Sequence, residues 1–384
     1  MSDPGRLAAL LADRSVVVVC GTGGVGKTTI SASLALGAAL AGRRVLVMTI
    51  DPARRLADSL GMEGRLNEAT PVDLRAALGP DVEIADGGSL HAMMLDAKGT
   101  WDATVARFAK SEETRRRILG NAYYQRASES LSGSQEYMAM ERLLEVHNTG
   151  AYDLVVLDTP PTRNALDFLE APGRLLAVLE EGVLGWLAPK KAGRFSPAAA
   201  GLRLFGKGRE AMFNVLERFM GGDVIRGIAD FVGAFGELLD GFRGRASEVT
   251  ALLQGERSAF LMVVAPNRIA LSEGLYFHDR LTEAGMPFRG FVINRVRGVG
   301  LSEESVPATA VEAGWSTGDA AHDAMAEAVW ANHRRALRWA QVDRHHIAAL
   351  KAHCGAALPY VEVPEQEGEV HDLVALHGLL RWLR

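Results

Sequence analysis

The sequence predicts an α/β fold with a doubly wound, mostly parallel sheet, on the basis of two patterns. Seven short apolar runs, rich in β-branched residues, each end in a polar or glycine-rich turn. Near-continuous apolar strands of this kind are buried on both faces, as in a parallel sheet that helices cover on each side. Helical patterns separate several of the runs, as at 28–40 and 136–146. Alternation of strands and helices over most of the chain indicates a doubly wound arrangement.

The strands are expected at 16–19, 45–50, 90–95, 154–157, 259–264, 291–293 and 360–363. Two stretches depart from the alternation. Residues 174–253 show no strand pattern and contain helical runs rich in Leu, Phe, Met and Gly. We interpret 174–253 as a helical insertion subdomain within a single domain that spans 1–384. The stretch 298–318 is rich in glycine and acidic residues and is predicted to be a surface loop.

Composition excludes several classes of protein. The chain has 384 residues, of which 48% are hydrophobic and 23% charged, as in a globular protein with a large core. Its net charge of -5 argues against a dedicated nucleic-acid surface. Two cysteines, Cys20 and Cys354, cannot form a disulfide framework or a cysteine-based zinc site. The sequence shows no signal peptide and no run of about 18 apolar residues, so we expect a cytoplasmic protein whose membrane association is at most peripheral.

A phosphate-binding motif directly follows the first expected strand. Gly21, Gly26, Lys27 and Thr28 satisfy the pattern G-x-x-x-x-G-K-[ST]. Glycines allow consecutive backbone N–H groups to curl around an anion, and the helix that begins near Lys27 presents its positive dipole end to phosphate. The expected nucleotide-binding residues of this loop are Gly23, Gly24, Val25, Gly26, Lys27, Thr28 and Thr29.

An expected magnesium site completes the pattern of a P-loop NTPase. The Thr28 hydroxyl is placed to ligate Mg²⁺ beside the phosphates. Asp158 closes the buried strand of YDLVVLDTPP, where a Walker B acid supports the ion through water. The motif therefore predicts that the chain binds ATP and Mg²⁺, with Thr28 and Asp158 at the metal and Lys27 at the β- and γ-phosphates.

A Rossmann oxidoreductase is an alternative interpretation of the same glycines. Gly21, Gly23 and Gly26 also satisfy G-x-G-x-x-G, and Asp51 ends the second strand near the place of a ribose-binding acid. The Lys-Thr-Thr sequence at 27–29, however, has no purpose in a dinucleotide-binding turn. That sequence and Asp158 favour the phosphate loop.

Four segments in this order resemble the ArsA family of ATPases: GTGGVGKTT, TIDPARRLADSLG, LSGSQEYMAM and LDTPPTRNALDFL. The resemblance runs from about Val16 to the segment 361–383 and is weakest in the helical insertion. It implies Mg-dependent ATP hydrolysis by a dimer that opens and closes with its nucleotide. Some members of the family handle or target membrane-protein clients. Arsenite-handling members use a cluster of thiols, which two cysteines cannot provide, so metalloid transport is not expected here.

The resemblance also implies roles for single residues. Asp51 would position or deprotonate the attacking water, and Asp158 with Thr159 would couple loss of the γ-phosphate to subunit movement. Asn294 would hydrogen-bond adenine, and the backbone around Pro364 would line the adenine pocket. From the residues alone, Asp51 could instead cap the following turn, Asp158 a helix, and Asn294 could be an ordinary turn residue.

Thr22 departs from the family pattern. Family members usually carry a lysine here that reaches the partner's phosphates across the dimer, and the short, neutral threonine cannot supply that charge. Loss of a cation of the arginine-finger kind typically lowers the rate by about 10³–10⁵-fold. Two alternatives follow. The chain could be a low-activity partner subunit in a heterodimer with a lysine-bearing relative. Otherwise a local cation replaces the lysine in a homodimer, with Arg163 the first candidate for a catalytic role and Arg54 the second.

Overall fold

The structure is a computed structural model that describes residues 7, 9, 11–51, 53–62, 66–122, 124–125, 128, 134–160, 238–298 and 309–383. The chain divides into two compact units. The first comprises Met1–Leu95, Glu145–Leu166 and Ala251–Arg384, and the second comprises Asp96–Leu144 and Asp167–Thr250. Most of the expected insertion subdomain at 174–253 lies outside the described residues, so that interpretation stays a prediction.

The first unit contains an eight-stranded sheet with the strand order β3-β4-β2-β5-β1-β6-β7-β8. The strands are β1 (Val16–Gly21), β2 (Arg44–Thr49), β3 (Thr70–Pro71), β4 (Ser89–Met94), β5 (Leu154–Asp158), β6 (Ser258–Val264), β7 (Phe288–Val296) and β8 (Tyr360–Pro364). Every neighbouring pair is parallel except β3 with β4. All seven expected strands are confirmed, and so is the doubly wound α/β class. The two-residue strand β3 is too short to leave an apolar pattern in the sequence.

The register of the central strands gathers polar residues at one edge of the sheet. Asp158 at the end of β5 lies opposite Val19 of β1 and Thr49 of β2. Gly21, which ends β1, lies opposite Val263 of β6. Because the strands are parallel, their carboxyl ends and the loops that follow them share this edge, where open α/β sheets bind their ligands.

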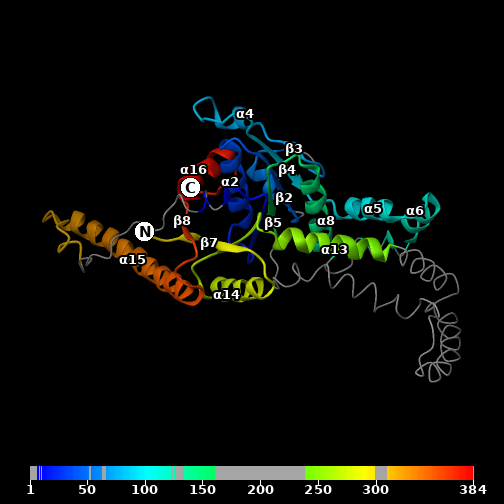
Figure 1. Ribbon diagram of the computed structural model, residues 1–384. Helices are drawn as coiled ribbons and strands as arrows, with labels where there is room; N and C mark the ends of the chain where they lie inside the picture. The colour runs from blue at the N-terminus through cyan, green and yellow to red at the C-terminus, as the bar shows by residue number, and fades with distance from the viewer. Residues whose placement is uncertain are drawn as a thin grey trace, which may run out of the picture. The chain divides into compact units, whose positions relative to one another are not determined.

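Helices α2 (Lys27–Leu40) and α16 (Leu373–Leu383) cover one face of the sheet and lie together in Figure 1. Their apolar side chains, Leu380 of α16 among them, form one buried cluster with alternate residues of the strands, including Val17 and Val19 of β1. The two helices approach closely at Gly37, where an added Cβ would lie 2.9 Å from Leu380 Cδ2. This packing fixes the axis of α2, and therefore the position of its N-terminus at the carboxyl edge.

The opposite face carries α14 (Arg268–Glu283), against which α15 (Ala320–Cys354) packs. No pattern in the sequence analysis predicted α15, which has 35 residues. Residues 320–329 include no buried side chain, so an apolar stripe is absent from the first third of the helix. Asp343 anchors the buried part of α15, because it accepts hydrogen bonds from the backbone N–H and the guanidinium of Arg297 just after β7. Of the predicted loop at 298–318, residues 309–318 form turns and bends, and 299–308 lie outside the described residues.

The described part of the second unit is helical. It contains α5 (Ala97–Phe108), α6 (Glu112–Leu119) and most of α8 (Ser134–Thr149) and α13 (Leu239–Gln254). Phe242 lies at the centre of an aromatic cluster, with ring centroids 5.6, 5.9 and 6.0 Å from those of Trp101, Phe108 and Tyr137. Next to this cluster, Glu141 is buried and paired with Arg245.

Candidate nucleotide site at the carboxyl edge of the sheet

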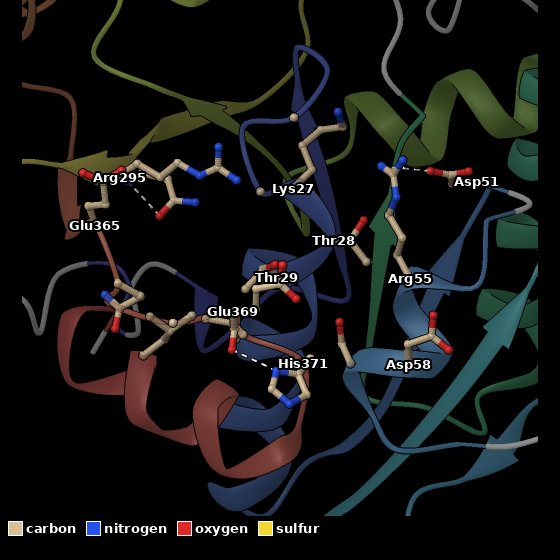
Figure 2. Close-up of a pocket in the computed structure, with 18 of the residues that line it drawn as sticks. Lys27, Thr28, Thr29, Asp51, Arg55, Asp58, Arg295, Glu365, Glu369 and His371 are labelled. Atoms are coloured by element: carbon tan, nitrogen blue, oxygen red, sulfur yellow. Dashed lines mark hydrogen bonds and ion pairs between the residues drawn. The ribbon is translucent and has the colours of Figure 1, made fainter.

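A cavity of about 670 Å³ opens at the carboxyl edge of the sheet in the first unit (Figure 2). Its volume lies within the range of about 300–1,000 Å³ that is usual for small-molecule sites. Four segments supply its lining: the phosphate loop with the start of α2, the segment after β2, the end of β7 and the loop after β8. The lining residues are Gly24, Gly26, Lys27, Thr28, Thr29, Asp51, Arg55, Asp58, Ser59, Thr159, Asn294, Arg295, Glu365, Gln366, Gly368, Glu369, Val370, His371 and Leu379.

The phosphate loop requires glycine at two positions for different reasons. Gly24 has φ +75°, a left-handed conformation that residues with a Cβ rarely adopt. Gly26 has φ +93°, and an added Cβ would lie 2.3 Å from Nδ2 of Asn294. A side chain at Gly26 would therefore collide with the neighbouring strand as well as strain the backbone. Both glycines give the loop the curled shape that phosphate binding needs.

Asn294 supports this loop from β7. Its Nδ2 donates a hydrogen bond of 2.9 Å to the carbonyl oxygen of Val25, and its Oδ1 accepts from the backbone N–H of Arg295 at 3.0 Å. These two bonds fix the orientation of the amide. Asn294 thus holds the phosphate loop in place, a role that the sequence analysis did not predict, and its contact with adenine stays a prediction.

The N-terminus of α2 faces the cavity. Gly26 caps the helix without a side-chain hydrogen bond, and Thr28 and Thr29 in its first turn line the cavity. The first N–H groups of an α-helix have no partners within the helix, and they carry its positive dipole end. This arrangement favours an anion at the mouth of the helix.

Lys27 is a buried cation beside the loop. Its side chain is 6% exposed, and its Nζ donates to the carbonyl oxygen of Thr22 at 2.8 Å. Burial lowers the pKa of Lys27, and the nearby Asp158 opposes this effect. An ammonium group held only by a neutral carbonyl retains most of its capacity to attract a phosphate.

Asp158 is 1% exposed and is surrounded by hydroxyl groups. Its Oδ2 accepts hydrogen bonds from Thr28 at 2.7 Å and from Thr49 at 2.9 Å, and its Oδ1 accepts from Ser31 at 3.5 Å. Burial raises the pKa of Asp158, although the hydroxyl groups and Lys27 oppose the shift. Among the described residues, the groups bonded to this carboxylate are neutral hydroxyls, which carry no charge to compensate for its burial.

The groups around Asp158 fit a magnesium ion. A hydroxyl oxygen and a carboxylate oxygen 2.7 Å apart are hard donors of the type that Mg²⁺ prefers, next to a cavity that can hold phosphate. No group of three or more His, Cys, Asp or Glu side chains within the described ranges could form a metal site by itself. This agrees with the usual binding of Mg²⁺ through one or two protein groups, water and substrate phosphates.

Asp51 lies at the end of β2 with two contacts. Its Oδ1 accepts a hydrogen bond of 2.9 Å from the backbone N–H of Ala53, which is the turn cap that the sequence left open as an alternative. Its Oδ2 lies 3.7 Å from Nη1 of Arg55, and its side chain is 18% exposed. The capping contact occupies one oxygen only, so the other remains at the cavity.

The structure brings together most of the predicted site residues and leaves a few apart. Gly23 is exposed, Val25 is buried, and neither is among the cavity-lining residues. Pro364 ends β8 without lining the cavity, whereas the loop after it does. Arg54 is exposed, does not line the cavity, and donates to the carbonyl of Met62 at 3.5 Å. Arg163 lies outside the described residues.

Sequence reasoning missed Arg55, Asp58 and Arg295 of the cavity wall, and of the segment after β8 it predicted only the backbone around Pro364. Arg55 and Asp58 come from the short helix α3 (Arg55–Ser59), and Glu365–His371 follows β8. Arg295 has φ +62° and lies where the pairing of β7 with β8 shifts register, a bulge that turns its side chain into the cavity. One available signal was the rule that loops after parallel strands meet at one edge, which would have included the segment after β8.

Comparison with known proteins agrees with this geometry. The chain matches the ArsA ATPase family, described as anion-transporting ATPases, over residues 14–318. The ATPase GET3 of Podospora anserina is 28% identical over 294 residues, which cover 76% of each chain. The ATPase get3 of Neurospora crassa is 25% identical over the same shares, and that of Aspergillus terreus is 32% identical over 41% of this chain and 42% of its own. The chain belongs to the ArsA ATPase family and is an ATP-hydrolysing enzyme.

Proposed function

We propose that this ATPase binds ATP with Mg²⁺ in the cavity at the carboxyl edge of the sheet. Hydrolysis of the ATP drives a dimer of the protein through a nucleotide-gated conformational cycle. That cycle serves to handle or target a membrane-protein client. One observation carries the binding mode. The Lys27 ammonium, the Thr28 hydroxyl and the Asp158 carboxylate lie together at the N-terminus of α2, beside a loop whose glycines adopt left-handed conformations. This combination suits a polyanion accompanied by a divalent cation.

The phosphates would lie against the loop and the first turn of α2. Lys27 would transfer its ammonium from the Thr22 carbonyl to the β- and γ-phosphates, since a charged oxygen is a stronger acceptor than a neutral one. The backbone around Gly24 and Gly26 would donate to the phosphates. Asp51 would orient the attacking water from the other side of the cavity, with its Oδ1 still bonded to Ala53.

Thr28 and Asp158 would hold the magnesium ion, the former directly and the latter through water. When bound, the ion neutralises part of the negative charge that develops on the phosphates. Its approach would also remove the electrostatic penalty that burial imposes on Asp158. Thr159, whose hydroxyl bonds the carbonyl of Val19, would transmit loss of the γ-phosphate to the chain that follows β5.

The base would occupy the other end of the cavity. Arg295 at the end of β7 and Glu365 in the loop after β8 lie at this end, away from Asp51 in Figure 2, and Asn294, which precedes Arg295, also lines the cavity. The Asn294 amide is occupied by Val25 and Arg295, and it has one further N–H that could reach adenine.

The dimer, the client and the cytoplasmic location are supported by membership of the ArsA family. No helix in the described ranges of the chain is long and apolar enough to cross a membrane.

A second function is favoured by Thr22. The chain could serve as a low-activity, nucleotide-binding subunit that a lysine-bearing relative completes in a heterodimer. The variant Thr22→Lys separates the two functions. A large gain in turnover would favour dependence on a partner, whereas an unchanged rate in an already active chain would favour the self-sufficient enzyme.

The test is ATP turnover of the purified chain, with and without Mg²⁺, together with light scattering in ADP and in a non-hydrolysable ATP analogue. We expect turnover that chelation of the metal abolishes and a dimer whose hydrodynamic size changes with the nucleotide. Turnover that persists in excess chelator would contradict the role of Thr28 and Asp158. A monomer in both nucleotide states would contradict the dimer cycle.

A further inference from the structure

In the described part of the chain, the cavity is lined by one lysine and two arginines: Lys27, Arg55 and Arg295. They lie in different places. Lys27 belongs to the phosphate loop, and Arg295 lies at the end of the cavity beside Asn294, where the base is proposed. Arg55 reaches the cavity from α3, beside Asp51, and its guanidinium extends toward the same end as the Lys27 ammonium in Figure 2. Arg55 is thus the cavity-lining cation outside the phosphate loop that is nearest to the proposed attacking water.

The contact between Arg55 and Asp51 is weak enough to be exchanged. The nearest nitrogen and oxygen are 3.7 Å apart, longer than a hydrogen bond, and the Arg55 side chain is 67% exposed. Ion pairs whose arginine is largely exposed to water typically contribute little to stability. The guanidinium is therefore free to move to a stronger anion, and a phosphate that bears more than one charge is such an anion.

The reaction needs a cation at this place. In hydrolysis, a water oxygen forms a bond to the γ-phosphorus while the bond from that phosphorus to the β,γ-bridging oxygen breaks. The electron pair of the broken bond stays with ADP, a proton leaves the water, and negative charge develops on the leaving oxygen and the γ-oxygens. Lys27 is proposed at the β- and γ-phosphates, where it meets part of this charge. Thr22 supplies none, and Arg55 is the described lining cation beside Asp51 that could meet the charge on the side of the attacking water.

We propose that Arg55 is a catalytic arginine supplied in cis, which leaves Asp51 when ATP binds and stabilises the charge that develops on the γ-phosphoryl group. This proposal rests on the proposed nucleotide position. It favours Arg55 over Arg54 as the substitute for the missing lysine, because the structure places Arg55 in the cavity wall and Arg54 outside it, while Arg163 lies outside the described residues.

The exchange would also control Asp51. Nη1 of Arg55 lies 3.7 Å from Oδ2 of Asp51, where it would compete with a water for that oxygen. Once Arg55 moves to the phosphate, Oδ2 becomes available to accept a proton from the attacking water. The same movement of Arg55 thus has two effects. It brings a positive charge to the γ-phosphate, and it releases Asp51 to orient the water. ATP whose γ-phosphate is not correctly placed would not draw Arg55 away from Asp51, and its hydrolysis would be slow.

The experiment compares Arg55→Ala, Arg55→Lys and Arg54→Ala with the wild-type chain. Arg54 is the matched control because it is the preceding residue, is exposed, does not line the cavity, and donates to the carbonyl of Met62. Two readouts are measured with Mg²⁺ present: kcat for ATP, and the affinity for ADP with and without aluminium fluoride, which mimics the phosphoryl group in transfer.

We expect Arg55→Ala to lower kcat by about 10²–10³-fold, the usual effect of removing one donor that acts on transition-state charge. The gain in affinity that aluminium fluoride gives to ADP should be largely lost, while the affinity for ADP alone should change by less than about threefold. Arg55→Lys should recover part of both quantities, because it keeps the charge and loses the planar fork. Arg54→Ala should behave as the wild type.

Arg55→Ala with wild-type kcat and an undiminished effect of aluminium fluoride would overturn the proposal, as would a loss confined to Arg54→Ala. A loss of ADP affinity equal to the loss of kcat would also overturn it, because that pattern indicates general phosphate binding. Failure of the proposed function would look different, since the wild-type chain itself would then show no Mg-dependent turnover. Circular dichroism confirms that each variant is folded.

Discussion

Two buried carboxylates in this chain lie in contrasting environments. In the second unit, Glu141 accepts from Arg245 Nε at 2.8 Å and lies 2.7 Å from its Nη2, with Arg107 Nη1 at 3.4 Å. In the first unit, Asp158 is equally buried, yet its hydrogen-bond partners are neutral hydroxyl groups. The nearest cation, Lys27, donates to a backbone carbonyl instead. Within the described residues, Asp158 forms no ion pair.

The pKa values show what this difference means. Burial alone lowers the pKa of Arg245, but hydrogen bonding and charge from Glu141, with the charge of Glu248, outweigh it and the net shift is upward. Glu141 and Arg245 thus satisfy each other's charge. In the first unit, burial raises the pKa of Asp158 and lowers that of Lys27, so both charged forms are disfavoured in the free protein. Such unsatisfied groups in a cavity are typical of a functional site, and a magnesium nucleotide would satisfy both.

The largest expected effect comes from breaking the satisfied pair. Glu141→Ala leaves Arg245 buried without its main partner, and such a change typically destabilises a protein by about 3–5 kcal/mol. Thermal or urea unfolding measures the loss. The double variant Glu141→Leu with Arg245→Met is the control and should recover much of the stability, because it leaves no buried charge. Equal stability of Glu141→Ala and the wild type would show that the pair contributes nothing.

In contrast to Glu141→Ala, Lys27→Met at the nucleotide site should lower activity and leave stability unchanged. We expect hydrolysis to fall by at least about 10²–10³-fold, because the variant removes a cation from the β- and γ-phosphates. The folded state should not be destabilised, since Lys27 is buried at an electrostatic disadvantage and methionine keeps its apolar length. Paired measurements of kcat and of the unfolding temperature test this. A large loss of stability would mean that Lys27 is structural.

Asn294→Ala should weaken nucleotide binding without abolishing turnover. The variant removes the hydrogen bond to Val25 that holds the phosphate loop, a bond whose net value is about 0.5–1.5 kcal/mol. We expect KM for ATP to rise up to about tenfold, with a smaller change in kcat. Asn294→Asp is the informative companion, because an ionised carboxylate cannot donate to the Val25 carbonyl and should weaken binding further. Unchanged KM in both variants would contradict the role of Asn294 as a support.

The smallest expected effect is a gain in stability. Asp158→Asn removes a buried charge while keeping a group that can bond Thr28 and Thr49, so the nucleotide-free protein should become more stable by about 0.5–2 kcal/mol at pH 7. Because the folded-state pKa of Asp158 is raised, the stability linked to its protonation is present at low pH and is lost as the pH rises through that pKa. The advantage of the variant should therefore vanish toward the usual Asp pKa of 3.8. A destabilised variant at pH 7 would contradict this sign.

The parts of the structure that the sequence predicted are those with strong local patterns. Buried parallel strands are apolar on both faces, so seven runs sufficed for the sheet, and the glycine-lysine-threonine motif located the loop and α2. Contacts between distant segments left no such trace. Asn294 and Val25 are 269 residues apart, and their bond depends on how β7 lies beside the loop. The exposed first third of α15 has no apolar stripe. Arg55 was passed over because the sequence does not show which of two adjacent arginines, Arg54 or Arg55, lines the cavity.

The central claim is that Lys27 and Asp158, the buried charges at the carboxyl edge of the sheet, bind a magnesium nucleotide. Calorimetric titration of ATP into the wild-type chain, with Mg²⁺ and then with chelator, tests it most directly. We predict saturable binding of one nucleotide per chain that weakens strongly when the metal is removed and is lost in Lys27→Met. Absence of any binding heat in the folded wild-type chain with Mg²⁺, or equal binding by Lys27→Met, would contradict it.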